Sequence, residues 1–288
     1  MKTTRRFAGC FAWCFTLVAI GLIWFSSRGA AQEFPPDQGQ TAKAFAPIDP
    51  TGYWVAVVTE DWRYRMLTAP RGDYYSLPLN VEGRKVADQW DAAKDIAGGK
   101  QCMAYGAPSL MRQPTRVHIT WDRDNAMKVE TDAGKQTRTF YFGAAPKTNA
   151  EASIQGLSIA QWQSPQITRF YTGKISTQDP DTPGFEGIRN QRVPPPPDTR
   201  KLGGTLKVVT THLKPGYLRN NGVPYSANTV LTEYYDIHKN GNNDYLVITS
   251  VVDDPQYLYV PWVVTNQFRR EADGSKWDPK PCELLLPK

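Results

Sequence analysis

Nine short segments with the composition of β-strands are spread along the chain, and they limit its fold more than any other sequence feature. Each is rich in β-branched or aromatic residues and is bounded by turn residues, in a chain with 22 Gly and 23 Pro. No helical pattern alternates with them, so a parallel βαβ arrangement is not expected. The predicted strands are 52–60, 116–121, 127–132, 136–142, 157–163, 205–211, 228–237, 245–252 and 261–268.

An open sheet of this size would leave exposed edges, and closure into a barrel removes them. We therefore expect a mainly β protein, an antiparallel β-barrel or a strongly curled sheet of about nine strands. One α-helix over 81–96 is expected to pack against it. Asn80 can cap its N-terminus, and Val86, Trp90 and Ala93 share one face.

The turn at 122–126 predicts the register of the second and third strands. A type I turn with Asn125 in the left-handed conformation gives a three-residue loop and pairs Asp122 with Ala126. This register places apolar pairs on one side of the sheet and ionisable pairs on the other. The further expected pairs are Trp121 with Met127, Ile119 with Val129, His118 with Glu130, and Arg116 with Asp132.

Residues 1–31 have the pattern of a signal peptide. Lys2, Arg5 and Arg6 form a basic start, residues 7–25 carry no charge, and small residues at 29–31 suit signal peptidase. Because the uncharged run is also long enough to span a bilayer, an uncleaved N-terminal anchor is the alternative. In both cases the rest of the chain is expected to be exported, either periplasmic or secreted.

The remaining chain is expected to contain one domain. Residues 32–50 are polar and proline-punctuated, which predicts a flexible lead-in, and residues 51–288 are expected to form a single β-barrel domain. Two irregular stretches, 143–156 and 178–204, interrupt the strands. Loops of this length are usually functional or mobile, and the role of the prolyl stretch 178–204 stays open.

The charge balance argues against a nucleic-acid partner. Residues 1–31 hold four of the 34 Lys and Arg and none of the 28 Asp and Glu, so the remainder has 30 against 28, a net charge of +2. No stripe of clustered basic residues follows, and nucleic-acid binding requires one. Contact with a membrane is expected only through an uncleaved N-terminal segment, and the oligomeric state stays open.

Two cysteines, Cys102 and Cys282, remain after the N-terminal segment. In an oxidising compartment they are expected to form one disulfide, which would close a loop worth on the order of 4 to 5 kcal/mol in the chain-entropy model. Two buried free thiols are the alternative. The chain has three histidines and no HExxH or CxxC spacing, so neither a metal site nor a cofactor is expected.

Aromatic residues on the predicted strands suggest a pocket for a small apolar or aromatic ligand inside the barrel, with a few oriented polar groups. A solid aromatic core is the alternative. The candidate ligand-binding residues are Arg116, His118, Arg138, Tyr141, Trp162, Glu233 and Tyr234.

Short motifs give the chain a resemblance to known proteins. Gly52-Tyr53-Trp54 resembles the G-x-W opening of lipocalins, in which a late arginine packs over the tryptophan, and Arg269 or Arg270 has the matching place here. More of the chain, 52–282, resembles uncharacterised exported bacterial proteins that look lipocalin-like. The motifs are Glu60-Asp61-Trp62-Arg63, Gly72-Asp73-Tyr74, Leu77-Pro78-Leu79-Asn80, Gly83-Arg84, Ala87-Asp88, Trp90-Asp91 and Gln101-Cys102. The resemblance implies a bacterial β-barrel and carries no activity.

Three functions are compatible with these features. The first is an exported binding protein with a small apolar or aromatic ligand in the barrel. The second is a barrel enzyme of isomerase, cyclase or lyase type, with His118 and Glu130 as acid and base. The third is an interaction module of the cell envelope with a solid core and an exposed apolar patch.

Overall fold

A computed structural model describes residues 41–143, 151–163, 204–284 and 286. The expected signal segment 1–31 and the prolyl stretch 178–204 lie outside the described residues, apart from Gly204. Among the helices that are described, none has the length and apolar character needed to cross a membrane.

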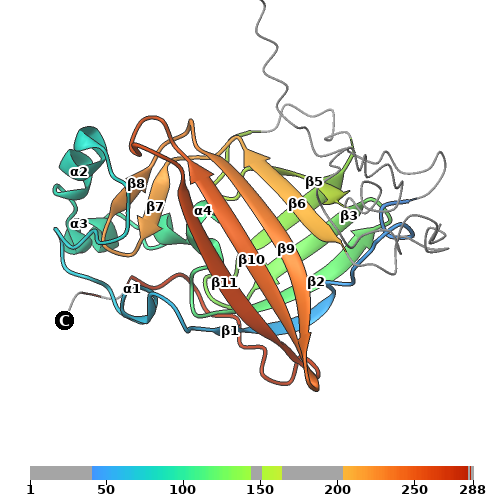
Figure 1. Ribbon diagram of the computed structural model, residues 1–288. Helices are drawn as coiled ribbons and strands as arrows, with labels where there is room; N and C mark the ends of the chain where they lie inside the picture. Colours follow the sequence, from blue (N-terminus) through green and yellow to red (C-terminus); the bar gives the residue numbers. More distant parts are fainter. Residues whose placement is uncertain (1–40, 144–150, 164–203, 285, 287–288) are drawn as a thin grey trace, which may run out of the picture. The chain divides into compact units, whose positions relative to one another are not determined.

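Nine strands form a closed barrel, and each of the nine predicted strands is present (Figure 1). The neighbour order around the ring is β1-β11-β10-β9-β6-β5-β4-β3-β2, and β2 pairs with β1. The barrel strands are β1 (Gly52–Val57), β2 (Arg116–Arg123), β3 (Ala126–Thr131), β4 (Thr137–Phe142), β5 (Leu157–Gln163), β6 (Thr205–Thr211), β9 (Val230–Asn240), β10 (Asn243–Asp253) and β11 (Trp262–Glu271). The mainly β, barrel-forming class is therefore confirmed.

One pair of neighbouring barrel strands departs from the expected antiparallel arrangement. β4 and β5 run parallel and share three paired positions, from Phe140 with Ser158 to Phe142 with Ala160. The other pairs around the barrel are antiparallel. Strand direction must alternate around a fully antiparallel ring, which therefore needs an even number of strands. A barrel of nine strands therefore closes only if at least one junction is parallel.

The hairpin of β2 and β3 confirms most of the predicted register. Three cross-strand pairs are those expected: His118 with Glu130, Ile119 with Val129, and Trp121 with Met127. The pairing of Asp122 with Ala126 is wrong, because a bulge after Trp121 leaves Arg123 opposite Ala126. The bulge takes up the extra residue, so Asn125 does not need the left-handed conformation and does not adopt it.

The barrel interior is occupied by one cluster of buried side chains. Alternate residues of each strand point inward, as the alternating burial along β5 and β6 shows. The largest members, among them Trp54, Phe140 and Tyr235, are fully buried. The cluster consists of Trp54, Met111, Val117, Ile119, Met127, Val129, Phe140, Ala160, Trp162, Leu206, Val208, Tyr235, Leu246, Ile248 and Phe268.

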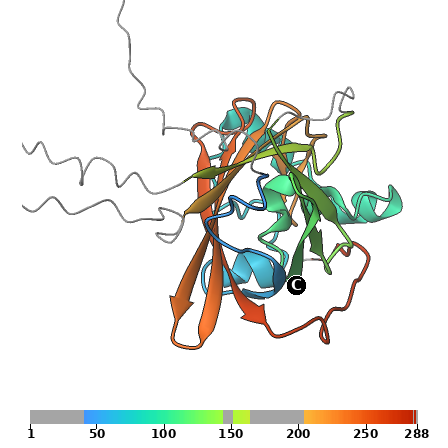
Figure 2. The ribbon, with the colours of Figure 1, turned by 90° about the vertical axis from the view of Figure 1, so that its right-hand side faces the viewer.

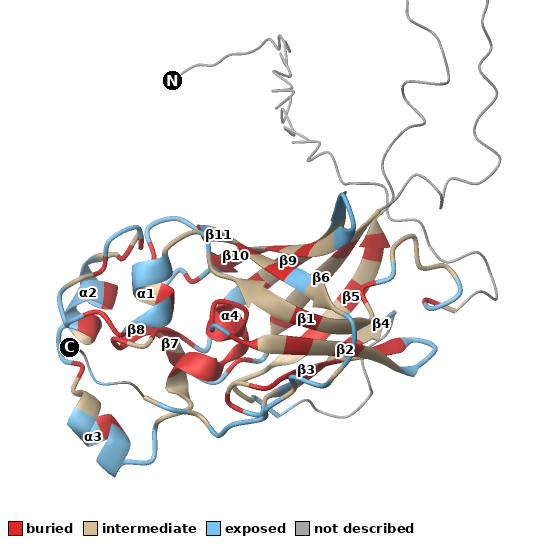
Figure 3. Cartoon of the chain, turned by 90° about the horizontal axis from the view of Figure 1, so that it is seen from below, coloured by how far each residue is buried: buried red, intermediate tan, exposed pale blue. Residues whose placement is uncertain are grey.

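A second buried cluster covers one end of the barrel. It joins α4 (Ala107–Leu110) and a small sheet of β7 (Gly216–Arg219) and β8 (Val223–Tyr225) to the ends of the barrel strands. α4 is buried along its whole length, as its red ribbon in Figure 3 shows. Met111, directly after α4, belongs to the barrel core. This covered end is called the capped end below.

Instead of the single expected helix over 81–96, two short helices form, α2 (Val81–Ala87) and α3 (Ala92–Ala97). Asn80 caps α2 as expected, since its side chain accepts a hydrogen bond from the Gly83 amide at 2.8 Å. The Asp91 side chain accepts hydrogen bonds from two amides of α3 and so starts a new helix. Three other short helical elements, α1 (Trp62–Met66), the 3-10 helix η1 (Met103–Tyr105) and α4, were not expected.

Residues 41–50, within the segment expected to be a flexible lead-in, lie against the other end of the barrel. Phe45, Ala46 and Ile48 pack on the barrel core. The Trp162 indole donates a hydrogen bond to the Ala42 carbonyl at 2.8 Å. Figure 2 shows this end of the barrel, with the segment drawn in blue.

Arg270 is the arginine that packs on Trp54, as the lipocalin resemblance implies. Its guanidinium carbon lies 4.0 Å from the centre of the Trp54 ring. It also donates hydrogen bonds to the carbonyls of Thr51 and Asp49. The last barrel strand is thereby fixed to the start of the first.

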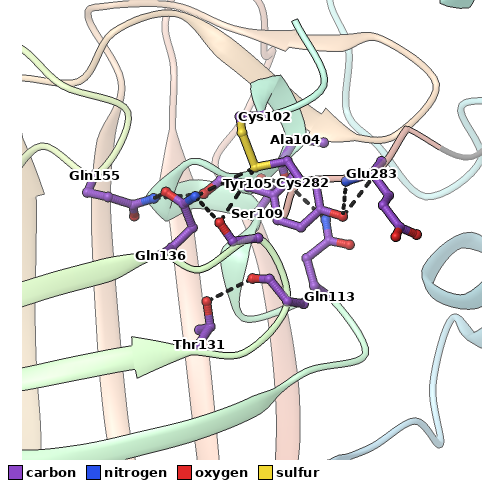
Figure 4. Close-up of a disulfide and its surroundings, with 12 residues drawn as sticks. Cys102, Ala104, Tyr105, Ser109, Gln113, Thr131, Gln136, Gln155, Cys282 and Glu283 are labelled. Atoms are coloured by element: carbon purple, nitrogen blue, oxygen red, sulfur yellow. Dashed lines mark hydrogen bonds between the residues drawn. A yellow bond between two sulfur atoms is a disulfide. The ribbon is translucent and has the colours of Figure 1, made fainter. Parts of the chain in front are cut away.

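The expected disulfide joins Cys102 and Cys282, 180 residues apart (Figure 4). It fixes the C-terminal segment beside η1, where the Tyr105 hydroxyl donates to the Glu283 carbonyl at 3.1 Å. A disulfide of this kind is compatible with an exported protein.

Candidate functional site

The structure distributes the expected ligand-binding residues over both faces of the barrel wall. Arg138, Trp162 and Glu233 point inward and are buried. Arg116, His118, Tyr141 and Tyr234 occupy the alternate positions, which face outward and are half-buried. They do not form one common site.

Arg138 and Glu233 form an ion pair inside the barrel. Two guanidinium nitrogens of Arg138 lie 2.6 and 3.1 Å from the two carboxylate oxygens of Glu233, and Arg138 also donates to the Thr210 hydroxyl at 3.1 Å. Burial alone would lower the pKa of Arg138, but the Glu233 carboxylate raises it. The two side chains neutralise each other, so this pair has no need of a charged ligand.

His118 and Glu130, the expected acid and base, lie on the outer wall of the barrel. The His118 Nδ1 is 3.5 Å from a Glu130 oxygen, and that oxygen is also 3.1 Å from the Lys128 ammonium. The His118 ring stacks on Tyr53 at 4.0 Å, and Trp277 covers both rings edge-on. This geometry suits a cross-strand side-chain contact beneath an aromatic cover better than proton transfer to an enclosed substrate.

An open pocket of about 440 Å³, called the outer pocket below, lies where β1, α1 and the start of β2 meet. The backbone of Ala56 donates to the Thr115 carbonyl at 3.0 Å, so the two strands form a continuous wall of the pocket. The lining residues are Val55, Ala56, Val58, Met66, Pro114, Thr115 and Arg116.

The turn between β1 and α1 brings Met66 to this pocket. Asp61 adopts the left-handed conformation, with φ of 49°, and its carbonyl accepts hydrogen bonds from the amides of Tyr64 and Arg65. Such a backbone is costly for a residue with a side chain. The chain reverses there, and α1 returns toward the strand that precedes it.

Arg116 is the polar group of the pocket, and its charge is already compensated. Its Nε donates to Glu271 at 2.9 Å, and another guanidinium nitrogen lies 3.7 Å from Asp132. With two carboxylates beside one guanidinium, the pocket favours a neutral molecule that accepts a hydrogen bond over an anion.

Sequence reasoning named Arg116, through the hairpin register, but none of the apolar lining residues. Met66 and Pro114 lie outside the predicted strands, and Val55, Ala56 and Val58 belong to the predicted strand 52–60 but were not singled out as site residues. A single apolar residue on an outer face, such as Val55, is common on protein surfaces and gives no signal of a site.

Comparison of the chain with protein-family models, with curated proteins and with solved structures finds no match. The barrel is present, and the relation to exported lipocalin-like proteins stays a prediction.

Proposed function

We propose that this chain is an exported β-barrel binding protein, and that it holds a small neutral, apolar or aromatic molecule in the outer pocket beside α1. The observation that carries this proposal is the pocket itself, an open volume of about 440 Å³ in which five of the seven lining residues are apolar. Small-molecule pockets typically measure roughly 300 to 1,000 Å³ and combine apolar walls with a few polar groups.

The proposed ligand is still a small apolar or aromatic molecule, as the sequence suggested, but its site is the outer pocket instead of the barrel interior. The inward-facing aromatic residues Trp54, Phe140, Tyr235 and Phe268 are fully buried against one another in the core. An apolar ligand inside the barrel would have to displace these side chains. The outer pocket requires no such rearrangement and still offers Arg116 as a donor.

Two features support export. The N-terminal segment 1–31 has the pattern of a signal peptide, and the disulfide between Cys102 and Cys282 suits an oxidising compartment. Expression of the full chain in a bacterium tests this directly. The proposal expects a periplasmic product that starts at Gln32, and a cytoplasmic product with both thiols free would contradict it.

Pocket-blocking substitutions test the binding function. Met66 is exposed at the pocket wall, so Met66→Trp is expected to fill the pocket without disturbing the core. Leu67→Trp is the matched control, because Leu67 is the next residue, is similarly exposed and does not line the pocket. Binding of the neutral fluorescent probe N-phenyl-naphthylamine should weaken roughly tenfold in Met66→Trp and stay unchanged in Leu67→Trp. Equal affinity of both variants and the parent would contradict the proposal.

An interaction surface is the second candidate function, and exposed aromatic side chains near α1 favour it. Trp62 is 60% exposed and Tyr75 is 74% exposed. Both belong to segments that Arg219 holds, since Arg219 contacts Asp61 and the Tyr75 carbonyl. In a periplasmic extract, a fluorescently labelled parent protein should then sediment faster than the Trp62→Ser/Tyr75→Ser variant. Equal sedimentation would remove this candidate.

A further inference from the structure

Three buried arginines come together at the capped end, next to the outer pocket but separate from it. Arg65 belongs to α1, Arg112 follows α4, and Arg219 ends β7. Their side chains are 0, 5 and 2% exposed. The fold thus removes three positive charges from water, and arginine is seldom buried unless it is paired. We call these residues the arginine cluster.

Two carboxylates face the three guanidinium groups. Glu60 lies 2.8 Å from Arg65, and one oxygen of Asp61 lies 3.1 Å from Arg112 and 3.8 Å from Arg219. The nearby Asp73 is engaged by Arg63 at 2.9 Å, on the exposed side of α1. The cluster therefore holds one positive charge more than its direct partners compensate.

Each arginine also has one buried nitrogen without a hydrogen-bond partner among the described residues. These atoms are Nη2 of Arg65, Nη1 of Arg112 and Nε of Arg219. A buried donor that makes no hydrogen bond is costly, and more so on a charged group. An acceptor oxygen beside any of these three nitrogens would therefore be strongly favoured.

Burial and mutual repulsion lower the pKa values of arginines in the cluster. Burial, followed by the positive charge of Arg112, lowers the pKa of Arg219 to about 10. Burial also lowers the pKa of Arg65, and Arg112 adds to this, while Glu60 opposes it. Arg112 is thus the charge that both neighbours share, and an anion bound beside it would reduce its repulsion with Arg65 and Arg219.

The arginines are held in place by groups that leave their free donors available. Arg219 donates to the Tyr75 carbonyl and the Ser76 hydroxyl, both at 2.9 Å. Arg65 Nε donates to the Arg112 carbonyl at 2.9 Å.

Aromatic rings complete the surroundings of two of these cations. Arg219 lies 4.1 Å from the Tyr64 ring centre, and Arg112 lies 4.9 Å from that of Trp262. Planar cations fixed in this way suit the two-oxygen geometry of carboxylate and phosphate groups.

We propose that the arginine cluster is an anion-binding site that takes one carboxylate or phosphate group between Arg65, Arg112 and Arg219. The half-exposed residues Asp61 and Tyr64 lie on its solvent side. No residue of the cluster lines the pocket proposed above, so the two sites stand on separate observations. A neutral ligand can occupy the pocket whether or not an anion occupies the cluster.

Titration calorimetry of the full exported protein, with inorganic phosphate and with benzoate at constant ionic strength, tests this site. At least one of the two anions should bind saturably with one site per chain, and chloride should not compete. Arg112→Gln should weaken binding by roughly tenfold or more, because the central charge-assisted contacts are lost. Arg63→Gln is the matched control, since Arg63 is 56% exposed and outside the cluster, and it should stay within about twofold of the parent.

Arg112→Lys provides a second variant if Arg112→Gln does not fold. It keeps the charge and removes the planar fork, so anion binding should weaken while the fold is retained. Binding of phosphate alone would assign the site to phosphate groups, and binding of benzoate alone would assign it to carboxylates. Absence of saturable binding of either anion, or equal losses in the Arg112 and Arg63 variants, would overturn the proposal. Because Met66→Trp and the neutral probe report only on the pocket, failure of one site leaves the other test unaffected.

Discussion

At the scale of single residues, the buried charges differ in how they are compensated. Arg138 and Glu233 are buried and satisfy each other through two contacts. The arginine cluster, in contrast, has fewer carboxylates than guanidinium groups. Buried ion pairs contribute little net stability when intact, but breaking one exposes the full desolvation cost of the remaining charge.

Removal of one partner of the Arg138–Glu233 pair is therefore expected to cost more stability than replacement of both. Glu233→Gln should lower the free energy of unfolding by roughly 3 to 5 kcal/mol, because it leaves Arg138 charged and uncompensated in the core. The double variant Arg138→Met/Glu233→Leu should lose less than that single variant. Urea unfolding measures both, with Arg63→Gln as a surface control that should cost at most about 1 kcal/mol. A double variant less stable than Glu233→Gln would show that the pair contributes net stability.

Buried tyrosines predict how stability depends on alkaline pH. Burial raises the pKa of Tyr74 to about 12 and also raises the pKa of Tyr217, Tyr225 and Tyr235. The unfolded phenols release their protons near pH ~10, so the folded state holds more protons above that value. The contribution of these tyrosines to the free energy of unfolding should be fully present below about pH 10 and should decrease toward pH 12. The lowered pKa values of Arg65, Arg112 and Arg219 act in the opposite direction, whereas burial also raises the pKa of Tyr64 and Tyr105 and so adds to the decline.

Urea midpoints across this pH range, together with the ultraviolet absorbance of phenolate, measure the effect. Tyr74→Phe should make the loss of stability with rising pH less steep, because it removes one tyrosine with a raised pKa. A midpoint that rises between pH ~10 and ~12 would contradict the assignment of these tyrosines as buried and protonated.

At the scale of elements, strand positions follow from sequence because each strand repeats a two-residue pattern over several residues. Short helices lack such a signal. α1 and α4 have five and four residues, too few to show a helical period, and they depend on tertiary contacts. The division of the expected helix into α2 and α3 has the same origin, since Trp90 at the break turns inward, where its indole donates to Asp95.

Substitution of Gly222, which lies against Trp90, tests the break between α2 and α3. Gly222 has φ of 77°, and a Cβ there would lie 2.1 Å from the Trp90 ring. Gly241 has φ of 60° and open space around its Cβ position, which makes it the matched control. Gly241→Ala should cost about 1 to 2 kcal/mol from the backbone alone. Gly222→Ala should cost at least about 1 kcal/mol more from the clash with Trp90, and equal losses would contradict the packing described.

At the scale of the whole molecule, closure depends on contacts that join distant parts of the chain. The parallel junction of β4 and β5 completes the ring, and Arg270 fixes its last strand to the start of the first. The disulfide ties the C-terminal segment to η1. The general barrel and the cysteine pair were predictable, because strand count and cysteine count are properties of the sequence.

Removal of the disulfide should have a large effect on global stability. The cross-link closes a loop of 180 residues, for which chain entropy gives on the order of 4 to 5 kcal/mol. Cys102→Ala/Cys282→Ala should therefore unfold at a much lower urea concentration than the oxidised parent. The reduced parent should match the variant, and an unchanged midpoint on reduction would show that the bond adds little.

The candidate sites could be predicted only in part, for reasons of geometry. The position of Arg116 beside Asp132 followed from a local hairpin register, which sequence specifies. The pocket and the arginine cluster each combine segments separated by tens of residues or more, such as α1, the residues after α4, and β7. Which of these meet depends on how the cap packs, and no local pattern encodes that.

The central claim is that a small ligand binds in the outer pocket and not inside the barrel, and methionine methyl groups report on both places. Met66 lines the pocket, whereas Met111 and Met127 are buried in the barrel core. In a methyl NMR titration of methionine-labelled protein with N-phenyl-naphthylamine, the Met66 signal should shift saturably while those of Met111 and Met127 stay in place. Shifts of Met111 or Met127 with Met66 unmoved would place the ligand in the barrel, and the absence of any shift would contradict binding.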